Sequence, residues 1–180
     1  MLRRSKMIQT LLLAVTFAAA TNSQPLASRR PSPTAESQDA DSQHHDGVQS
    51  RGDHAMGFSH ETTTHHFRLY KTGGAIEVFA NDPKDTATRD QIRAHLSHIV
   101  KMFSAGDFNI PMFIHATTPP GSATMAKRRD QIRYQFQEVP RGAKIQIVTA
   151  NSEAVEAVHG FLRFQISDHQ TGDSLEVAGR

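Results

Sequence analysis

The stretch TTTHHFRLYKTGGAIEVFAN, residues 62–81, decides the fold of this chain. Its apolar side chains alternate on both sides of Gly73–Gly74, and alternation with a period of two is typical of β-strands. Four of these side chains are expected to share one face of a sheet: Phe67, Leu69, Ile76 and Val78. Glycine accepts the positive φ of a tight turn, so the two glycines are expected to form the turn. The stretch therefore predicts a β-hairpin.

The same pattern returns later in the chain. Residues 132–151 alternate around a Pro-Arg-Gly turn, and alignment of Ile76 with Ile145, 69 positions later, matches the second strands of the two hairpins. A helix is predicted after each hairpin, over 89–105 and over 153–168, because apolar residues recur there at helical spacing. The sequence therefore predicts an α+β fold. In this fold a duplicated ββα unit gives a four-stranded antiparallel sheet with two helices on one face.

The second predicted helix carries more apolar surface than one buried face needs. Phe161 and Phe164 point away from its main apolar stripe. One explanation is contact with residues 107–124, which are apolar but interrupted by prolines and are expected to pack irregularly on the core. The alternative is a homodimer through Phe161 and Phe164, because exposed aromatic patches often mark association.

The two ends of the chain lack the pattern of a folded domain. Residues 1–20 have a basic head, a short apolar run and an Ala-x-Ala sequence, which predict a signal peptide and a periplasmic or secreted protein. A retained membrane anchor is the alternative, although the run is shorter than the roughly 20 residues of a spanning helix. No membrane span is expected after signal removal. Residues 21–56 are rich in polar residues and predict a disordered linker. A single domain over 57–173 and a flexible tail over 174–180 complete the prediction.

The composition argues against several classes of function. The chain has no cysteine, which excludes disulfides, thiolate catalysis and thiolate metal ligands. It has 20 Lys and Arg against 18 Asp and Glu, and removal of the three cations near the N-terminus leaves 17 against 18. A nucleic-acid partner is therefore not expected, because it would need basic residues massed on one face. The 11 histidines are the unusual feature.

Several of these histidines are candidate metal ligands. Strand alternation places His65 on the same face as Phe67 and turns His66 to the other face. His95 and His98 lie one turn apart on the flank of the first predicted helix, within reach of one another. Two other histidines have simpler explanations. His159 falls on a buried helix face, where a hydrogen-bonded core histidine is expected, and His169 lies at a helix C-terminus, where a cation is favourable.

A metal site is predicted where these residues converge. Met102 continues the flank of the first helix, and His115 follows an apolar segment that can reach it. The predicted ligands are four histidines: His65, His95, His98 and His115. Imidazoles with a thioether suit copper and imidazoles with a carboxylate suit zinc, so copper or zinc is the expected metal. The alternative is a set of boundary histidines that bind no metal.

Four blocks of the chain resemble a protein family. They are GFSHETTTHHF, RDQIRAHLSHI, AGDFNIPMFIH and HGFLRFQISDH. With its TTHHF, HLxHI and GDFxxP blocks, the chain is similar to a small exported bacterial family of uncharacterised proteins. The resemblance covers about residues 56–173 and implies export and a single-domain architecture. It implies no activity and assigns no functional residue.

Three functions are consistent with the sequence. The first is an exported, periplasmic small binding protein that coordinates a transition metal or metallo-cofactor through histidines. The second is a structural or partner-binding module without a metal site. The third is a metal-assisted hydrolase, which would add a carboxylate such as Glu61 or Asp107 as general base and would need an open coordination position.

Overall fold

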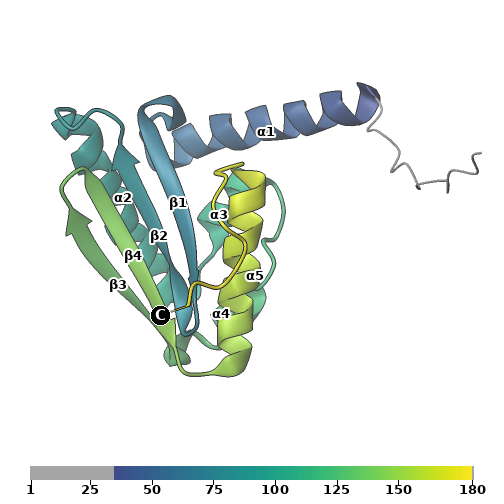
Figure 1. Ribbon diagram of the computed structural model, residues 1–180, viewed down its shortest axis with the longest axis vertical. Coiled ribbons are helices and arrows are strands. Elements are labelled where there is room, and N and C mark those ends of the chain that lie inside the picture. Colours follow the sequence, from purple (N-terminus) through teal and green to yellow (C-terminus); the bar gives the residue numbers. More distant parts are fainter. Residues whose placement is uncertain (1–34, 180) are drawn as a thin grey trace, which may run out of the picture. The chain divides into compact units, whose positions relative to one another are not determined.

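Two β-hairpins form the framework of the molecule (Figure 1). The computed structural model describes residues 35–179, and its strands pair in the antiparallel order β1–β2–β4–β3. The strands are β1 (Thr63–Tyr70), β2 (Gly73–Ala80), β3 (Ile132–Val139) and β4 (Gly142–Thr149). The helices are α1 (Ala35–Met56), α2 (Thr86–Ser104), α3 (Asn109–His115), α4 (Ser122–Lys127) and α5 (Ser152–Asp168), with 3-10 turns η1 (His60–Thr62) and η2 (Arg129–Gln131). The predicted α+β fold is confirmed.

The two hairpins are related by a shift of 69 residues. The bounds of β1 and β3, of β2 and β4, and of η1 and η2 all differ by this number. Ile76 and Ile145, which the sequence alignment matches, are direct partners across the β2–β4 pair. Two equivalent antiparallel strands that meet at equivalent residues are related by a local two-fold axis, so the duplication is also a geometric one.

Each helix covers the hairpin of the other unit. α2 follows the first hairpin but packs mainly on β3 and β4, whereas α5 follows the second hairpin and packs mainly on β1 and β2. Both helices start at a capping side chain: Asp85 accepts a hydrogen bond from the Thr88 amide at 3.0 Å, and Asn151 accepts one from the Ala154 amide at 2.9 Å. The caps are 66 residues apart because the connection into α5 is three residues shorter.

The glycines of the first hairpin serve packing and do not form its turn. Tyr70 pairs with Gly73, so the turn consists of Lys71 and Thr72, and the predicted turn at Gly73–Gly74 is wrong. A Cβ at Gly74 would collide with the side chain of Leu162 in α5. The missing side chain therefore lets α5 lie close to β2.

Residues 35–56 differ from the predicted disordered linker, because they form α1. Side chains are described from residue 42, and Val48 is fully buried. The Arg51 Nε donates to the Ile114 carbonyl at 2.7 Å, and the His44 Nε2 lies 2.8 Å from a carboxylate oxygen of Asp168. The segment has few apolar residues, so its contacts with the domain are largely polar and leave little periodic signal in the sequence.

Two other segments are more regular than predicted. Residues 107–124 contain α3 and the start of α4. The predicted flexible tail lies along β1, where the Ala178 amide donates to the Leu69 carbonyl at 2.9 Å. This contact partly covers an edge strand that would otherwise expose unpaired backbone groups.

The aromatic residues of α5 pack inside the chain. Phe161 is 1% exposed and its ring lies 5.8 Å from the rings of Phe103 and Phe108. Phe164 lies 4.9 Å from the His115 ring. A homodimer through Phe161 is therefore wrong, because that side chain is part of the core, and contact with the segment 107–124 is the correct explanation.

The predicted signal peptide, residues 1–20, and residues 21–34 of the predicted linker lie outside the described residues. Export therefore stays a prediction. Within residues 35–179, no helix is long and apolar enough to cross a bilayer.

Candidate functional site

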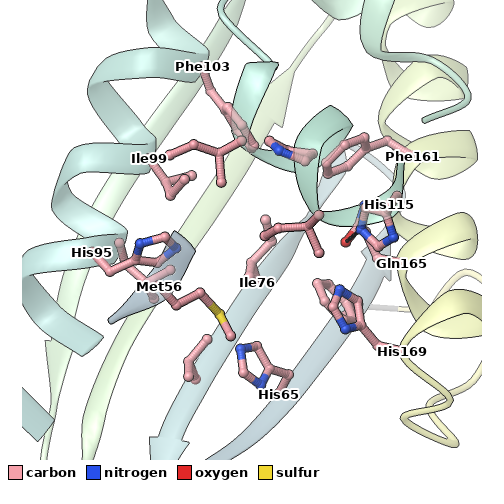
Figure 2. Close-up of a pocket in the computed structure, with 16 residues that line it drawn as sticks. Met56, His65, Ile76, His95, Ile99, Phe103, His115, Phe161, Gln165 and His169 are labelled. Atoms are coloured by element: carbon pink, nitrogen blue, oxygen red, sulfur yellow. Dashed lines mark hydrogen bonds between the residues drawn. The ribbon is translucent and has the colours of Figure 1, made fainter. Parts of the chain in front are cut away.

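A small cavity opens between the sheet and its helices, and four histidines line it (Figure 2). Its volume is about 70 Å³. The histidines come from β1, α2, α3 and the end of α5: His65, His95, His115 and His169. Met56, at the end of α1, and Gln165 of α5 also line it, and the remaining wall is apolar. The structure thus brings together three of the four predicted ligands and adds His169.

His65 and His169 form the centre of the site. Their ring centroids are 6.0 Å apart and their planes are parallel to within 1°. Burial lowers the pKa of His65 to about 4, and the neighbouring His95 lowers it further. Burial also lowers the pKa of His169 to about 3, with His115 and His65 adding to the effect. Both imidazoles are therefore neutral at physiological pH, and the predicted cation at position 169 is wrong.

His95 and Met56 lie beside this pair. Burial lowers the pKa of His95 to about 4, and the nearby His98 acts in the same direction. The His95 ring meets the Phe58 ring edge-on at 5.8 Å. In Figure 2 the Met56 side chain lies between the His95 and His65 rings, and all three side chains line the same cavity. The site therefore combines neutral imidazole nitrogens with a thioether.

His115 belongs to a chain of hydrogen bonds behind the cavity. It is 1% exposed, its Nδ1 lies 2.5 Å from Asp168 and its Nε2 lies 3.0 Å from the Gln165 Oε1. The other carboxylate oxygen of Asp168 meets His44 of α1. Burial acts to raise the pKa of Asp168, but the hydrogen bonds from His115 and His44 outweigh it and hold this pKa below its ordinary value. These contacts fix the orientation of the His115 ring.

A second, more polar space of about 230 Å³ adjoins the cavity beneath α1. Met56, His65 and His169 line both spaces. The second space is otherwise lined mainly by polar groups of α1, η1 and β1, among them His45 and His60. The three shared residues therefore stand between an apolar cavity and a polar one.

Some predicted site residues lie elsewhere. His98 is exposed on α2 and does not line the cavity, because it points one turn outward from the buried face that carries His95. Neither of the carboxylates considered for hydrolysis, Glu61 and Asp107, lines it. His159 is the predicted core histidine, and its Nε2 lies 2.9 Å from the Tyr70 carbonyl. Within the described part of the chain, no group of three or more His, Cys, Asp or Glu side chains is arranged to hold a metal ion.

The sequence analysis missed Met56, Gln165 and His169 as parts of the site. The signal for the last two was present, because they continue the buried face of α5 at helical spacing from Leu162. Met56 carried no such signal, since it ends a helix with little apolar pattern.

Comparison with protein-family models, with curated proteins and with solved structures found no match. The resemblance to an exported bacterial family therefore stays a prediction. The function has to follow from the chemistry of the cavity.

Proposed function

We propose that this protein is a small exported binding protein that holds Cu(I) through Met56, His65 and His169, with His95 beside them. The observation that carries the proposal is the pair of parallel imidazoles, His65 and His169, in the wall of one cavity together with a thioether.

The separation of the two imidazoles supports a shared ion. A metal ion lies about 2 Å from a histidine nitrogen, so two rings that share one ion have centroids at most about 6.3 Å apart. The observed separation of 6.0 Å falls within this reach. A site of two histidines and one methionine also agrees with the lack of any three-member His, Cys, Asp or Glu group among residues 35–179.

The ligand types favour Cu(I) over Zn²⁺. Thioether sulfur is a soft ligand that selects Cu(I), whereas zinc sites are built from imidazole, thiolate and carboxylate. Of the described residues that line the cavity, none is Asp or Glu. The surrounding wall is mostly apolar, and an ion of charge +1 loses less hydration energy there than an ion of charge +2 does.

The neutral state of the imidazoles also favours metal binding. A histidine must lose its proton before it ligates a metal. The lowered pKa values of His65, His95 and His169 mean that no proton has to be displaced at neutral pH. Binding should therefore be independent of pH between about 6 and 8, in contrast to binding at exposed histidines with a pKa of about 6.5.

Hydrolysis is a second candidate function, because Asp168 and His115 form a buried carboxylate–imidazole pair. Such a pair can orient a general base toward a bound water. Asp168→Asn would abolish a metal-dependent hydrolysis and leave Cu(I) affinity within about tenfold, since Asp168 is not among the proposed ligands. Loss of Cu(I) binding in this variant without any hydrolysis in the wild type would remove this candidate.

A competition titration tests the proposed function. The full chain is titrated with Cu(I) against a chromogenic Cu(I) chelator, together with His65→Phe, His169→Phe and the exposed control His98→Ala. We expect one strongly bound ion in the wild type and the control, and loss of this ion in both pocket variants. At a free Cu(I) concentration one hundred times Kd, the bound ion should also stabilise the fold by about 2.7 kcal/mol. Equal binding by all four proteins would assign the copper to other histidines and overturn the proposal.

A further inference from the structure

Beyond the proposed ligands, the cavity retains space and one unused polar group. The wall facing this space is built from apolar side chains of the sheet and of α2, including Ile76, Val78, Leu96 and Ile99. The volume of about 70 Å³ is roughly half that of a 150 Å³ protein cavity that takes up benzene or xenon. It suits a guest of two or three heavy atoms without charge.

The unused polar group belongs to Gln165. This side chain is 5% exposed, and its Oε1 faces the Nε2 of His115 at 3.0 Å. Its Nε2 is buried and has no hydrogen-bond partner among the described residues. Buried donors in native proteins are almost always paired, so an unpaired one in a cavity wall indicates a missing acceptor.

The Gln165 side chain cannot easily turn to another partner. Asp168 holds the Nδ1 of His115 at 2.5 Å, and His115 in turn meets the Gln165 Oε1. The amide group is therefore held in place from one side and leaves its nitrogen for a guest. Gln165 also lies one turn before His169 on α5, so this donor and the proposed metal ligand point from the same end of one helix.

We infer that the cavity admits a neutral diatomic molecule, which binds to the copper ion and accepts a hydrogen bond from the Gln165 amide. The inference rests on the proposed function, because two imidazoles and one thioether leave Cu(I) with a free coordination position. Cu(I) donates electron density to ligands such as carbon monoxide, nitric oxide and dioxygen, and this increases the negative charge on the outer atom of the ligand. An amide donor in an apolar cavity then stabilises the bound molecule.

Carbon monoxide is the probe that tests this inference. The full chain is loaded with Cu(I), its copper content is measured, and the infrared stretching band of bound CO is recorded. Gln165→Leu removes the donor at similar volume, Val78→Ile narrows the cavity, and the exposed Gln137→Leu is the matched control. We expect one CO per copper, a band at higher frequency in Gln165→Leu, a CO affinity at least fivefold lower in Val78→Ile, and no change in Gln137→Leu.

The outcomes separate the two proposals. A chain that retains no copper overturns the proposed function and this inference together. Copper that binds no CO, or a band at the same frequency in the wild type and Gln165→Leu, overturns this inference alone. Equal CO affinity in Val78→Ile and the wild type would place the CO outside the cavity and would also overturn it.

Discussion

The two halves of the molecule use equivalent positions for different purposes. A shift of 69 residues relates His65 in β1 to Tyr134 in β3, and a shift of 66 relates Phe103 in α2 to His169. In one half the rings of Phe103 and Tyr134 lie 5.8 Å apart, and in the other half the rings of His65 and His169 lie 6.0 Å apart. An aromatic pair, Phe103 and Tyr134, thus corresponds to an imidazole pair, His65 and His169.

The correspondence extends to neighbouring side chains. Met56 precedes the imidazole pair and Met125 stands 69 residues later, where it is fully buried. Gln165 in α5 corresponds to Ile99 in α2. The aromatic half is therefore an ordinary hydrophobic core, and the imidazole half has the same framework with polar groups in place of apolar ones. Since both halves provide the same scaffold, the histidines are not needed to complete the fold, which is why we assign them to binding.

The largest difference between the halves should appear on truncation. Phe103→Ala should lower the free energy of unfolding by about 4 kcal/mol, because it leaves a cavity in a close-packed core. His169→Ala should lower it by about 1 kcal/mol in the metal-free protein at pH 7.5, since its ring already borders a cavity. Denaturant unfolding at pH 7.5 measures both values, and equal losses would show that the imidazole pair is a structural element.

Acid should weaken the imidazole half only. The pKa of His65 is about 4 and that of His169 is about 3 in the folded state, both below the value of about 6.5 in an unfolded chain. Between pH 6.5 and 4 the unfolded state therefore binds more protons, and stability falls as the pH falls. From pH 6.5 to 5 the two residues together should cost on the order of 3 kcal/mol.

The variant His65→Tyr/His169→Phe gives the imidazole half the residues of the aromatic half and tests this pH dependence. It should lose most of the decrease in stability between pH 6.5 and 5, as followed by denaturant unfolding across this range. The single variant His98→Ala, which changes an exposed residue, is the control and should behave as the wild type does. An unchanged decrease in the double variant would show that other groups set the acid sensitivity.

The two methionines should differ in their effect on copper. Met56→Leu should weaken Cu(I) binding by about tenfold or more, which corresponds to about 1.4 kcal/mol, because it removes the soft ligand at similar volume. Met125→Leu makes the same change in the aromatic half and should leave Cu(I) affinity unaltered. Chelator competition measures both constants. A loss of affinity in Met125→Leu as large as that in Met56→Leu would contradict the difference between the halves.

The smallest effect concerns α1, which is much longer than α4, the helix that carries the equivalent methionine. His44 is 45% exposed where it meets Asp168, and exposed ion pairs contribute little. His44→Ala should therefore lower the free energy of unfolding by roughly 0.5 kcal/mol. A loss above about 2 kcal/mol would mean that this contact, and not the burial of Val48, holds α1 against the domain.

The hairpins, both long helices and three of the cavity histidines could be predicted from the sequence because each depends on a local pattern. Strand alternation turned His65 inward with Phe67, and helical spacing placed His95 near the buried stripe of α2. The same spacing could not decide between His95 and His98, since both lie on the flank of that stripe. Which of them faces the cavity depends on where β1 and α1 pack, and that is a tertiary property.

The rest of the site depended on contacts between distant segments. The crossing of the helices over opposite hairpins brings the end of α5 against β1 and so brings His169 to His65. α1 carries few apolar residues, yet buried Val48 and the Arg51 contact with α3 bring Met56 to the cavity. No periodicity in residues 35–56 reports these contacts.

The ligands of the bound ion test the difference between the halves most directly. X-ray absorption at the copper edge, recorded on the Cu(I)-loaded full chain, should show one sulfur and at least two imidazole nitrogens around the ion. The variant His65→Tyr/His169→Phe should remain folded and show no such copper signal. A copper ion with nitrogen ligands and no sulfur in the wild type, or the same spectrum in the double variant, would contradict the assignment of the imidazole half to Cu(I).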